Sequence, residues 1–123
     1  MCAKFTKRTI LVADDDIISF KILSFIIERL GACAVWVKNG LEAIEMVRNN
    51  HNLNLIFMDI DMPVLDGIEA TSKIKEINND LPVIILTSDY YKKNASIKAG
   101  CDDFITKPIH ASNITKILQK YLG

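Results

Sequence analysis

The chain has 123 residues, of which half are apolar and about a quarter are charged. We therefore expect a single globular domain over residues 1–123, with a core that runs from about residue 8 to residue 122. Fifteen basic residues balance fifteen acidic ones, and this neutrality indicates that the domain itself binds neither nucleic acid nor an anionic membrane.

Five short apolar segments recur along the chain. Their apolar residues are continuous rather than alternating, which predicts strands covered on both faces at residues 9–13, 33–37, 55–58, 83–86 and 104–106. Apolar residues at helical spacing predict helices within residues 16–30, 41–48, 67–77, 90–98 and 114–122. The fourth of these, YYKKNASIK, has few apolar anchors, so we expect a short or loosely formed helix there.

This alternation of strands and helices predicts an α/β fold. Five strands each followed by a helix, (βα)₅, imply a doubly wound parallel sheet with right-handed crossovers and helices on both faces, which is a three-layer sandwich. Asp16 and Asn39 are placed as helix N-caps, and Gly31 and Gly100 lie where helices should end.

Polar side chains collect where the predicted strands end. The second strand delivers only Lys38 and Asn39, whereas the other four deliver acids, hydroxyls and a lysine: Asp14 and Asp15, Asp59, Thr87 and Ser88, and Lys107. In a parallel sheet of this kind, ligands bind beyond the carboxyl ends of the strands. The coincidence of four strand ends favours one functional site over separate structural roles such as helix capping.

The residue types at this edge indicate phosphoryl chemistry. Three carboxylates close together, Asp14, Asp15 and Asp59, would repel one another, so the site needs a cation. Oxygen ligands without histidine or cysteine favour a hard ion, Mg²⁺ above Ca²⁺ or Mn²⁺. A metal site alone would not need Thr87 and Lys107, but these two would bind the oxygens of a phosphoryl group while a carboxylate attacks phosphorus.

Together these residues resemble the receiver domain of two-component response regulators, from about Thr9 to Leu122. The resemblance is carried by the acidic pair in LVADDD, by MDIDMPVLDG, by the threonine in IILTS and by the Lys-Pro in DDFITKPI. It implies a flavodoxin-like fold with a five-stranded parallel sheet in the order 2-1-3-4-5. It also implies a phosphoacceptor in phosphorelay signalling, which changes conformation and catalyses at most its own phosphorylation and dephosphorylation.

The resemblance implies a role for each acid. Asp59 matches the aspartate that accepts a phosphoryl group from a phosphohistidine on a partner. Asp14 and Asp15 match the acidic pair that holds Mg²⁺ with Asp59, and Mn²⁺ is an alternative ion. Asp61 matches the position whose backbone carbonyl binds the metal and whose side chain tunes dephosphorylation.

On the phosphoryl side, Thr87 matches the hydroxyl that moves onto a phosphoryl oxygen, with Ser88 beside it, and Lys107 matches the lysine that pairs with that group. The bond from Lys107 to Pro108 is expected to be cis. Phe104 stands at an aromatic switch position where tyrosine is more usual. Its phenyl ring lacks a hydroxyl, so a switching role and a plain core role are equally open.

Ile18, Ile22 and Phe25 fall on an outer flank of the first helix, beside the acidic pair. Either neighbouring elements partly cover this flank, or it is a docking face for a helical phosphodonor. The resemblance implies that the donor is a sensor histidine kinase or a histidine phosphotransfer domain. It also implies that the chain is a monomer or a weak homodimer.

Other protein classes share parts of this pattern. LIFMDIDM also resembles the DxD strand of haloacid-dehalogenase-type phosphatases, in which Asp59 would attack phosphorus and Asp61 would be the acid/base. That motif normally lies on the first strand, whereas a βαβα unit precedes it here. A flavodoxin-type module would need a phosphate loop where DDD stands. A degenerate scaffold receiver would not need intact Asp59, Thr87 and Lys107.

The sequence also indicates the cellular compartment in which we expect the protein. No signal peptide is recognisable, and no apolar run is long enough to span a bilayer. Cys2, Cys33 and Cys101 match neither a disulfide framework nor a zinc pattern, which indicates reduced thiols in a cytoplasmic protein. The chain is either a single-domain regulator or a receiver excised from a hybrid sensor kinase, the group that MPVLDGIEATSKIK resembles more closely.

Overall fold

The computed structural model describes residues 5–123, so Cys2 lies outside the described residues. The strands are β1 (Thr9–Ala13), β2 (Cys33–Val37), β3 (Leu55–Asp59), β4 (Val83–Thr87) and β5 (Asp103–Thr106). The helices are α1 (Ile17–Arg29), α2 (Gly40–Asn49), α3 (Gly67–Ile77), α4 (Lys93–Ala99) and α5 (Ala111–Leu122). A 3₁₀ turn, η1 (Tyr90–Lys92), precedes α4.

All five strands run parallel in one sheet. Their order, β2-β1-β3-β4-β5, confirms the doubly wound, flavodoxin-like fold. Ala13 lies beside Met58 across β1 and β3, and Thr87 lies beside Thr106 across β4 and β5. The carboxyl ends of these four strands therefore come level at one edge of the sheet.

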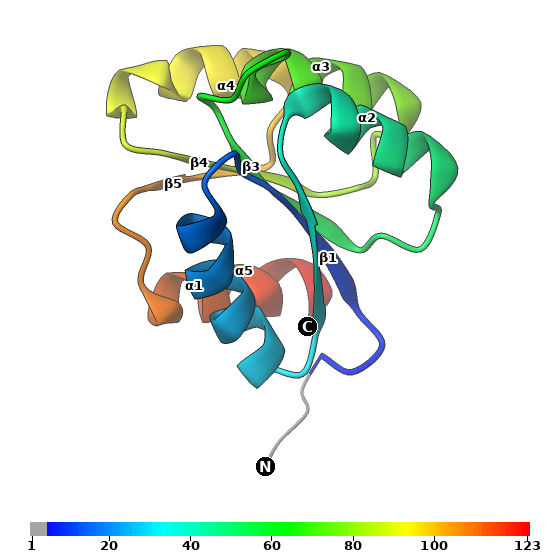
Figure 1. Ribbon diagram of the computed structural model, residues 1–123, viewed down its shortest axis with the longest axis vertical. Helices are drawn as coiled ribbons and strands as arrows, with labels where there is room; N and C mark the ends of the chain where they lie inside the picture. The colour runs from blue at the N-terminus through cyan, green and yellow to red at the C-terminus, as the bar shows by residue number, and fades with distance from the viewer. Residues whose placement is uncertain (1–4) are drawn as a thin grey trace.

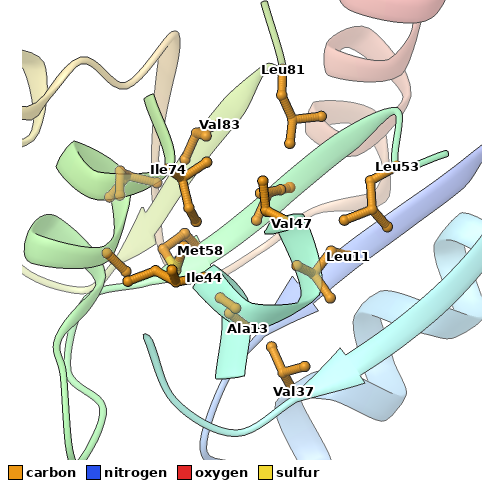
Figure 2. Packing of buried hydrophobic residues seen from close by; sticks show 14 of the residues in the cluster. Leu11, Ala13, Val37, Ile44, Val47, Leu53, Met58, Ile74, Leu81 and Val83 are labelled. Carbon is orange, nitrogen blue, oxygen red and sulfur yellow. The ribbon is translucent and has the colours of Figure 1, made fainter. Parts of the chain in front are cut away.

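Helices cover both faces of this sheet. In Figure 1, α2, α3 and α4 lie along the upper face, and α1 and α5 lie along the lower one. Figure 2 shows the apolar core under α2 and α3, where Met58 packs near Ile44. A second core joins Phe57 to Leu23 of α1 and Leu118 of α5. Successive residues of β3 thus enter opposite cores, which explains why the strand has no polar position before its last residue.

The ends of the helices follow the signals in the sequence. The side chains of Asp16 and Asn39 cap α1 and α2 by accepting a backbone N–H at 3.0 and 2.8 Å. Gly31 and Gly100 have φ angles of 95° and 104° where α1 and α4 end, a conformation that favours glycine. The fourth helix is short, as expected, because α4 has seven residues after its 3₁₀ turn.

One expectation needs correction. β2 and β5 are edge strands and are only partly covered: β2 runs from an exposed Cys33 to a buried Val37, and in β5 only Ile105 is buried. The continuous apolar run of β2, CAVWV, therefore does not reflect burial on both faces. Part of the run is explained by Trp36, which stacks on Phe20 of α1 with ring centroids 5.4 Å apart. Separately, none of the helices within residues 5–123 has the length and hydrophobicity needed to cross a membrane.

Candidate functional site

Four neighbouring strands place polar side chains at one edge of the sheet. Asp14 follows β1, Asp59 ends β3, Thr87 ends β4 and Lys107 follows β5. Lys107 Nζ lies 3.4 Å from Asp59 Oδ1 and 3.8 Å from Asp14 Oδ2. The lysine thus bridges acids from two different strands, and the structure brings together the residues that the sequence places at this edge.

Asp59 is held through one of its two carboxylate oxygens. Its Oδ1 accepts the backbone N–H of Ile60 at 3.0 Å and lies near the Lys107 ammonium. Within residues 5–123, its Oδ2 has no hydrogen-bond or ion-pair partner. Asp59 is only 8% exposed. The side chain therefore presents one positioned oxygen and one oxygen that is available to a ligand.

Asp14 and Asp15 form an acidic group with Asp59. One carboxylate oxygen of each lies within 4.8 Å of the others. Asp14 is buried, and its Oδ1 accepts the backbone N–H of Asp16 at 2.9 Å, whereas Asp15 is exposed. A set of oxygen donors at this spacing fits a hard divalent cation.

Burial dominates the electrostatics of the site. Loss of solvation raises the pKa of Asp59 from 3.8 to about 6, while nearby Lys107 lowers it and Asp14 raises it. Burial is also the largest cause of the raised pKa of Asp14. Repulsion between the acids therefore contributes less than their removal from water, and a bound cation would compensate for both.

Thr87 closes the site from the side of β4. It is buried, and its hydroxyl oxygen accepts the backbone N–H of Asp89 at 3.1 Å. Its carbonyl accepts the N–H of Lys107 at 2.8 Å. The hydroxyl proton has no acceptor within residues 5–123, so it is available to a ligand. Ser88 is exposed and forms no hydrogen bond with the part of the chain that the structure describes.

Asp61 is an exposed outer acid and is not one of the three carboxylates that lie within 4.8 Å of one another. Its carboxylate Oδ1 lies 3.7 Å from the Nζ of Lys92, at the end of η1. Nothing in the sequence indicated a role for Lys92. The pair depends on where η1 lies relative to the loop after β3, which no local pattern encodes.

Phe104 lies on β5, partly buried against the core under α3. Its ring meets Tyr90 of η1 edge to face, with centroids 6.4 Å apart. Phe104 therefore connects the core to the turn that follows Thr87. At the end of the same strand, the peptide bond between Lys107 and Pro108 is cis.

The flank of α1 is open to solvent. Ile18, Ile22 and Phe25 are 65%, 54% and 62% exposed. Neighbouring groups thus cover this flank only in part, among them the Arg29 guanidinium 5.5 Å from the centre of the Phe25 ring, and the docking role stays a prediction. Ile17, also exposed, continues the apolar surface toward the start of the helix. That start follows Asp14 and Asp15 directly, so the apolar face adjoins the acidic group.

Two supporting residues escaped the sequence analysis. Trp36 Nε1 donates to the backbone carbonyl of Asp14 at 2.8 Å and so positions the end of β1. Gly67 begins α3 against the end of β3, where a Cβ atom would collide with the carbonyl oxygen of Asp59. Asp66 and Gly67 form a pair that is typical of a turn, but nothing in the sequence links Trp36 to the site.

Known proteins match this chain over most of its length. The family model for the response regulator receiver domain matches residues 10–119. The chemotaxis protein CheY of Halobacterium salinarum is 36% identical over 117 residues, which covers 94% of this chain and 97% of that protein. Two-component system protein A of Emericella nidulans is 32% identical over 95% of this chain, but the chain spans only 18% of that protein.

Solved structures share both the fold and the family. One is the receiver domain of a sensor histidine kinase from Pseudomonas aeruginosa, with a magnesium ion coordinated in its active site cleft. It is 26% identical with a TM-score of 0.87, covering 94% of this chain and 98% of that one. Another is the Saccharomyces cerevisiae co-crystal of the histidine phosphotransfer protein Ypd1 with the receiver domain of Ssk1. It is 27% identical with a TM-score of 0.86, covering 95% of this chain and 90% of that one. These matches give no support to a haloacid-dehalogenase-type phosphatase.

Proposed function

Because the chain belongs to the family of response regulator receiver domains of two-component systems, we propose that Asp59 is its phosphoacceptor. The observation that carries this proposal is the pairing of Asp59 at 3.4 Å with Lys107, which leaves one carboxylate oxygen available in an acidic, buried setting. The phosphoryl group comes from a phosphohistidine on a partner protein. The chain then acts as a signalling domain rather than as a member of a classical enzyme family.

The transfer uses few groups of the chain. Asp59 Oδ2 forms a bond to phosphorus while the bond from phosphorus to the imidazole nitrogen breaks, and the histidine leaves. Lys107 pairs with one phosphoryl oxygen, and the hydroxyl of Thr87 donates its proton to another in a hydrogen bond. The raised pKa of Asp59 reflects the carboxylate charge that burial destabilises, and bonding to phosphorus removes that charge from the carboxyl group.

Asp14, Asp15 and Asp59 would hold Mg²⁺, and the backbone carbonyl of Asp61 is a further proposed ligand. The spacing of the three carboxylates and the all-oxygen donor set support this choice. When bound, the ion neutralises phosphoryl oxygens during transfer. Mn²⁺ prefers similar oxygen ligands and would substitute for it.

The proposed partner is a sensor histidine kinase or a histidine phosphotransfer domain, and the exposed flank of α1 is its docking face. An apolar helix face packs naturally against another helix, and this one adjoins the acidic group. Ile22→Asp should slow phosphotransfer from a purified histidine phosphotransfer domain by about tenfold or more. It should leave labelling by acetyl phosphate intact, and an equal loss of both would contradict the docking role.

Labelling by acetyl phosphate tests the phosphoacceptor directly. With Mg²⁺ present, the wild-type chain should take up one phosphoryl group and Asp59→Asn should take up none. Asp80→Asn is a matched control, because it removes an exposed acid from the loop before β4. Labelling that survives Asp59→Asn would overturn the assignment, and sustained turnover of phosphomonoesters would favour a phosphatase instead.

A further inference from the structure

The proposed site carries more negative charge than positive. Its four carboxylates are those of Asp14, Asp15, Asp59 and Asp61. Within residues 5–123, the ammonium groups closer than 4 Å to any of them belong to Lys107 and Lys92. We call the solvent-facing side of the site, where Asp61 is exposed, its mouth. Phosphoryl donors are anions, so an acidic mouth repels them before any bond forms. Lys107 faces inward onto the buried acids, which leaves Lys92 as the cation beside the outer acid.

The backbone of Lys92 is anchored by its own segment and by the site. The N–H of Lys92 donates to the carbonyl of Asp89 at 3.2 Å, and the N–H of Asp89 donates to the hydroxyl of Thr87 at 3.1 Å. The carbonyl of Lys92 accepts the hydroxyl of the buried Ser96 at 2.9 Å. These bonds position the backbone of Lys92, and its side chain, which is 42% exposed, places Nζ 3.7 Å from Asp61 Oδ1.

We propose that Lys92, paired with Asp61 across the mouth of the site, attracts anionic phosphoryl donors and speeds their reaction with Asp59. The proposal rests on the phosphoacceptor role of Asp59 and adds to it a residue that touches none of the reacting atoms. Lys92 acts through its charge, which offsets that of Asp61 and lowers the repulsion of an incoming anion. The same charge opposes Mg²⁺, so removing it should affect the anion and the cation in opposite directions.

The first test measures labelling by acetyl phosphate at saturating Mg²⁺ and low ionic strength. Lys92→Gln should lower the second-order rate constant by about two- to fivefold, as expected for an exposed charge. The difference should shrink as salt is added, because screening weakens exposed charges. Lys92→Arg should retain the wild-type rate. Lys98→Gln removes the same charge from an exposed position of α4 and should change nothing.

The second test measures Mg²⁺ affinity without any phosphoryl donor. The fluorescence of Trp36 is a suitable reporter, because its indole N–H donates to the backbone of Asp14. Lys92→Gln should bind Mg²⁺ about twofold more tightly, since the substitution removes one positive charge from the mouth of the site. A variant that had merely lost structure would bind both Mg²⁺ and the donor less well, so opposite changes separate the charge effect from misfolding.

Equal labelling rates for wild type and Lys92→Gln at low ionic strength would overturn the inference. So would an unchanged or weaker Mg²⁺ affinity. A wild-type chain that takes up no phosphoryl group on Asp59 would instead overturn the proposed function, and this inference with it.

Discussion

Lys75 and Lys107 pair with aspartates at opposite edges of the sheet, and the two clusters differ in how closely their charges are paired. Lys75 Nζ lies 2.6 Å from Asp102 Oδ2 just before β5 and also donates to two backbone carbonyls, at 2.7 and 3.1 Å. Lys107, just after β5, is 3.4 Å from Asp59 and 3.8 Å from Asp14. The same residue types thus form a closed cluster at one edge of the sheet and an open one at the other.

The difference separates a structural role from a functional one. Lys75 uses all three of its donors, and Asp102 also accepts the backbone N–H of Val83 at 2.8 Å. That cluster therefore ties α3 to the starts of β4 and β5. At the other edge, the longer distances leave donor capacity on Lys107 and an available oxygen on Asp59. Charges there remain incompletely paired until ligands bind.

The largest expected effect concerns the closed cluster. Lys75→Met should lower the free energy of unfolding by about 3 kcal/mol, because it leaves Asp102 and two carbonyls without their donor. Lys107→Met, the matched change at the open cluster, should lower it less, because its distances of 3.4 and 3.8 Å to the acids are longer than the 2.6 Å between Lys75 and Asp102. Urea denaturation of both variants measures the contrast, and equal losses would show that the two clusters do not differ as the distances indicate.

The next largest effect concerns the buried carboxylate of Asp59 in the open cluster. In metal-free protein at pH 7, Asp59→Asn should raise the free energy of unfolding, since it removes a buried carboxylate charge. The difference between a pKa of 3.8 unfolded and about 6 folded sets an upper limit of about 3 kcal/mol. Urea denaturation in the presence of a chelator measures it. A variant less stable than wild type would show that Asp59 serves the fold rather than a ligand.

The raised pKa of Asp59 also implies that the stability of the protein depends on pH. Folding raises the pKa of Asp59, so the folded state holds the proton more tightly, and stability falls as pH rises from 3.8 through about 6. The stability difference between Asp59→Asn and wild type should therefore grow between pH 4 and 7, roughly the interval between the two pKa values. Measuring the difference at each pH cancels the contribution of acids that do not interact with Asp59, and a flat difference would contradict the raised pKa.

The smallest effect concerns the loop after β3. Val64 is exposed and has a φ angle of 70°, a conformation that costs an L residue about 1–2 kcal/mol. Glycine adopts it freely, although its greater freedom in the unfolded chain offsets roughly 0.5–1 kcal/mol. Val64→Gly should therefore stabilise the protein by about 0.5 kcal/mol, measured as a higher urea midpoint. Destabilisation would indicate that the Val64 side chain makes contacts that matter more than the strain.

Much of the site could be predicted because of how parallel sheets are built. Buried strands have continuous apolar runs, so the residue at which each run ends is visible in the sequence. Asp14, Asp59, Thr87 and Lys107 stand at such points, and a shared sheet edge follows from the parallel order. The pair of Lys92 and Asp61 could not be predicted, because it joins two loops whose relative position depends on packing.

The sequence by itself determined the alternation of strands and helices, the chemistry of the strand ends and the exposed character of the α4 region. These are local properties of apolar spacing, capping residues and side-chain type. Only the tertiary structure decided which lysine is closed in by its partners and which stays available. Lys75 and Lys107 look alike in the chain. Their surroundings differ because the N–H groups, carbonyls and acids around each lysine come from segments that only folding brings together. Folding also sets how much solvent reaches each lysine.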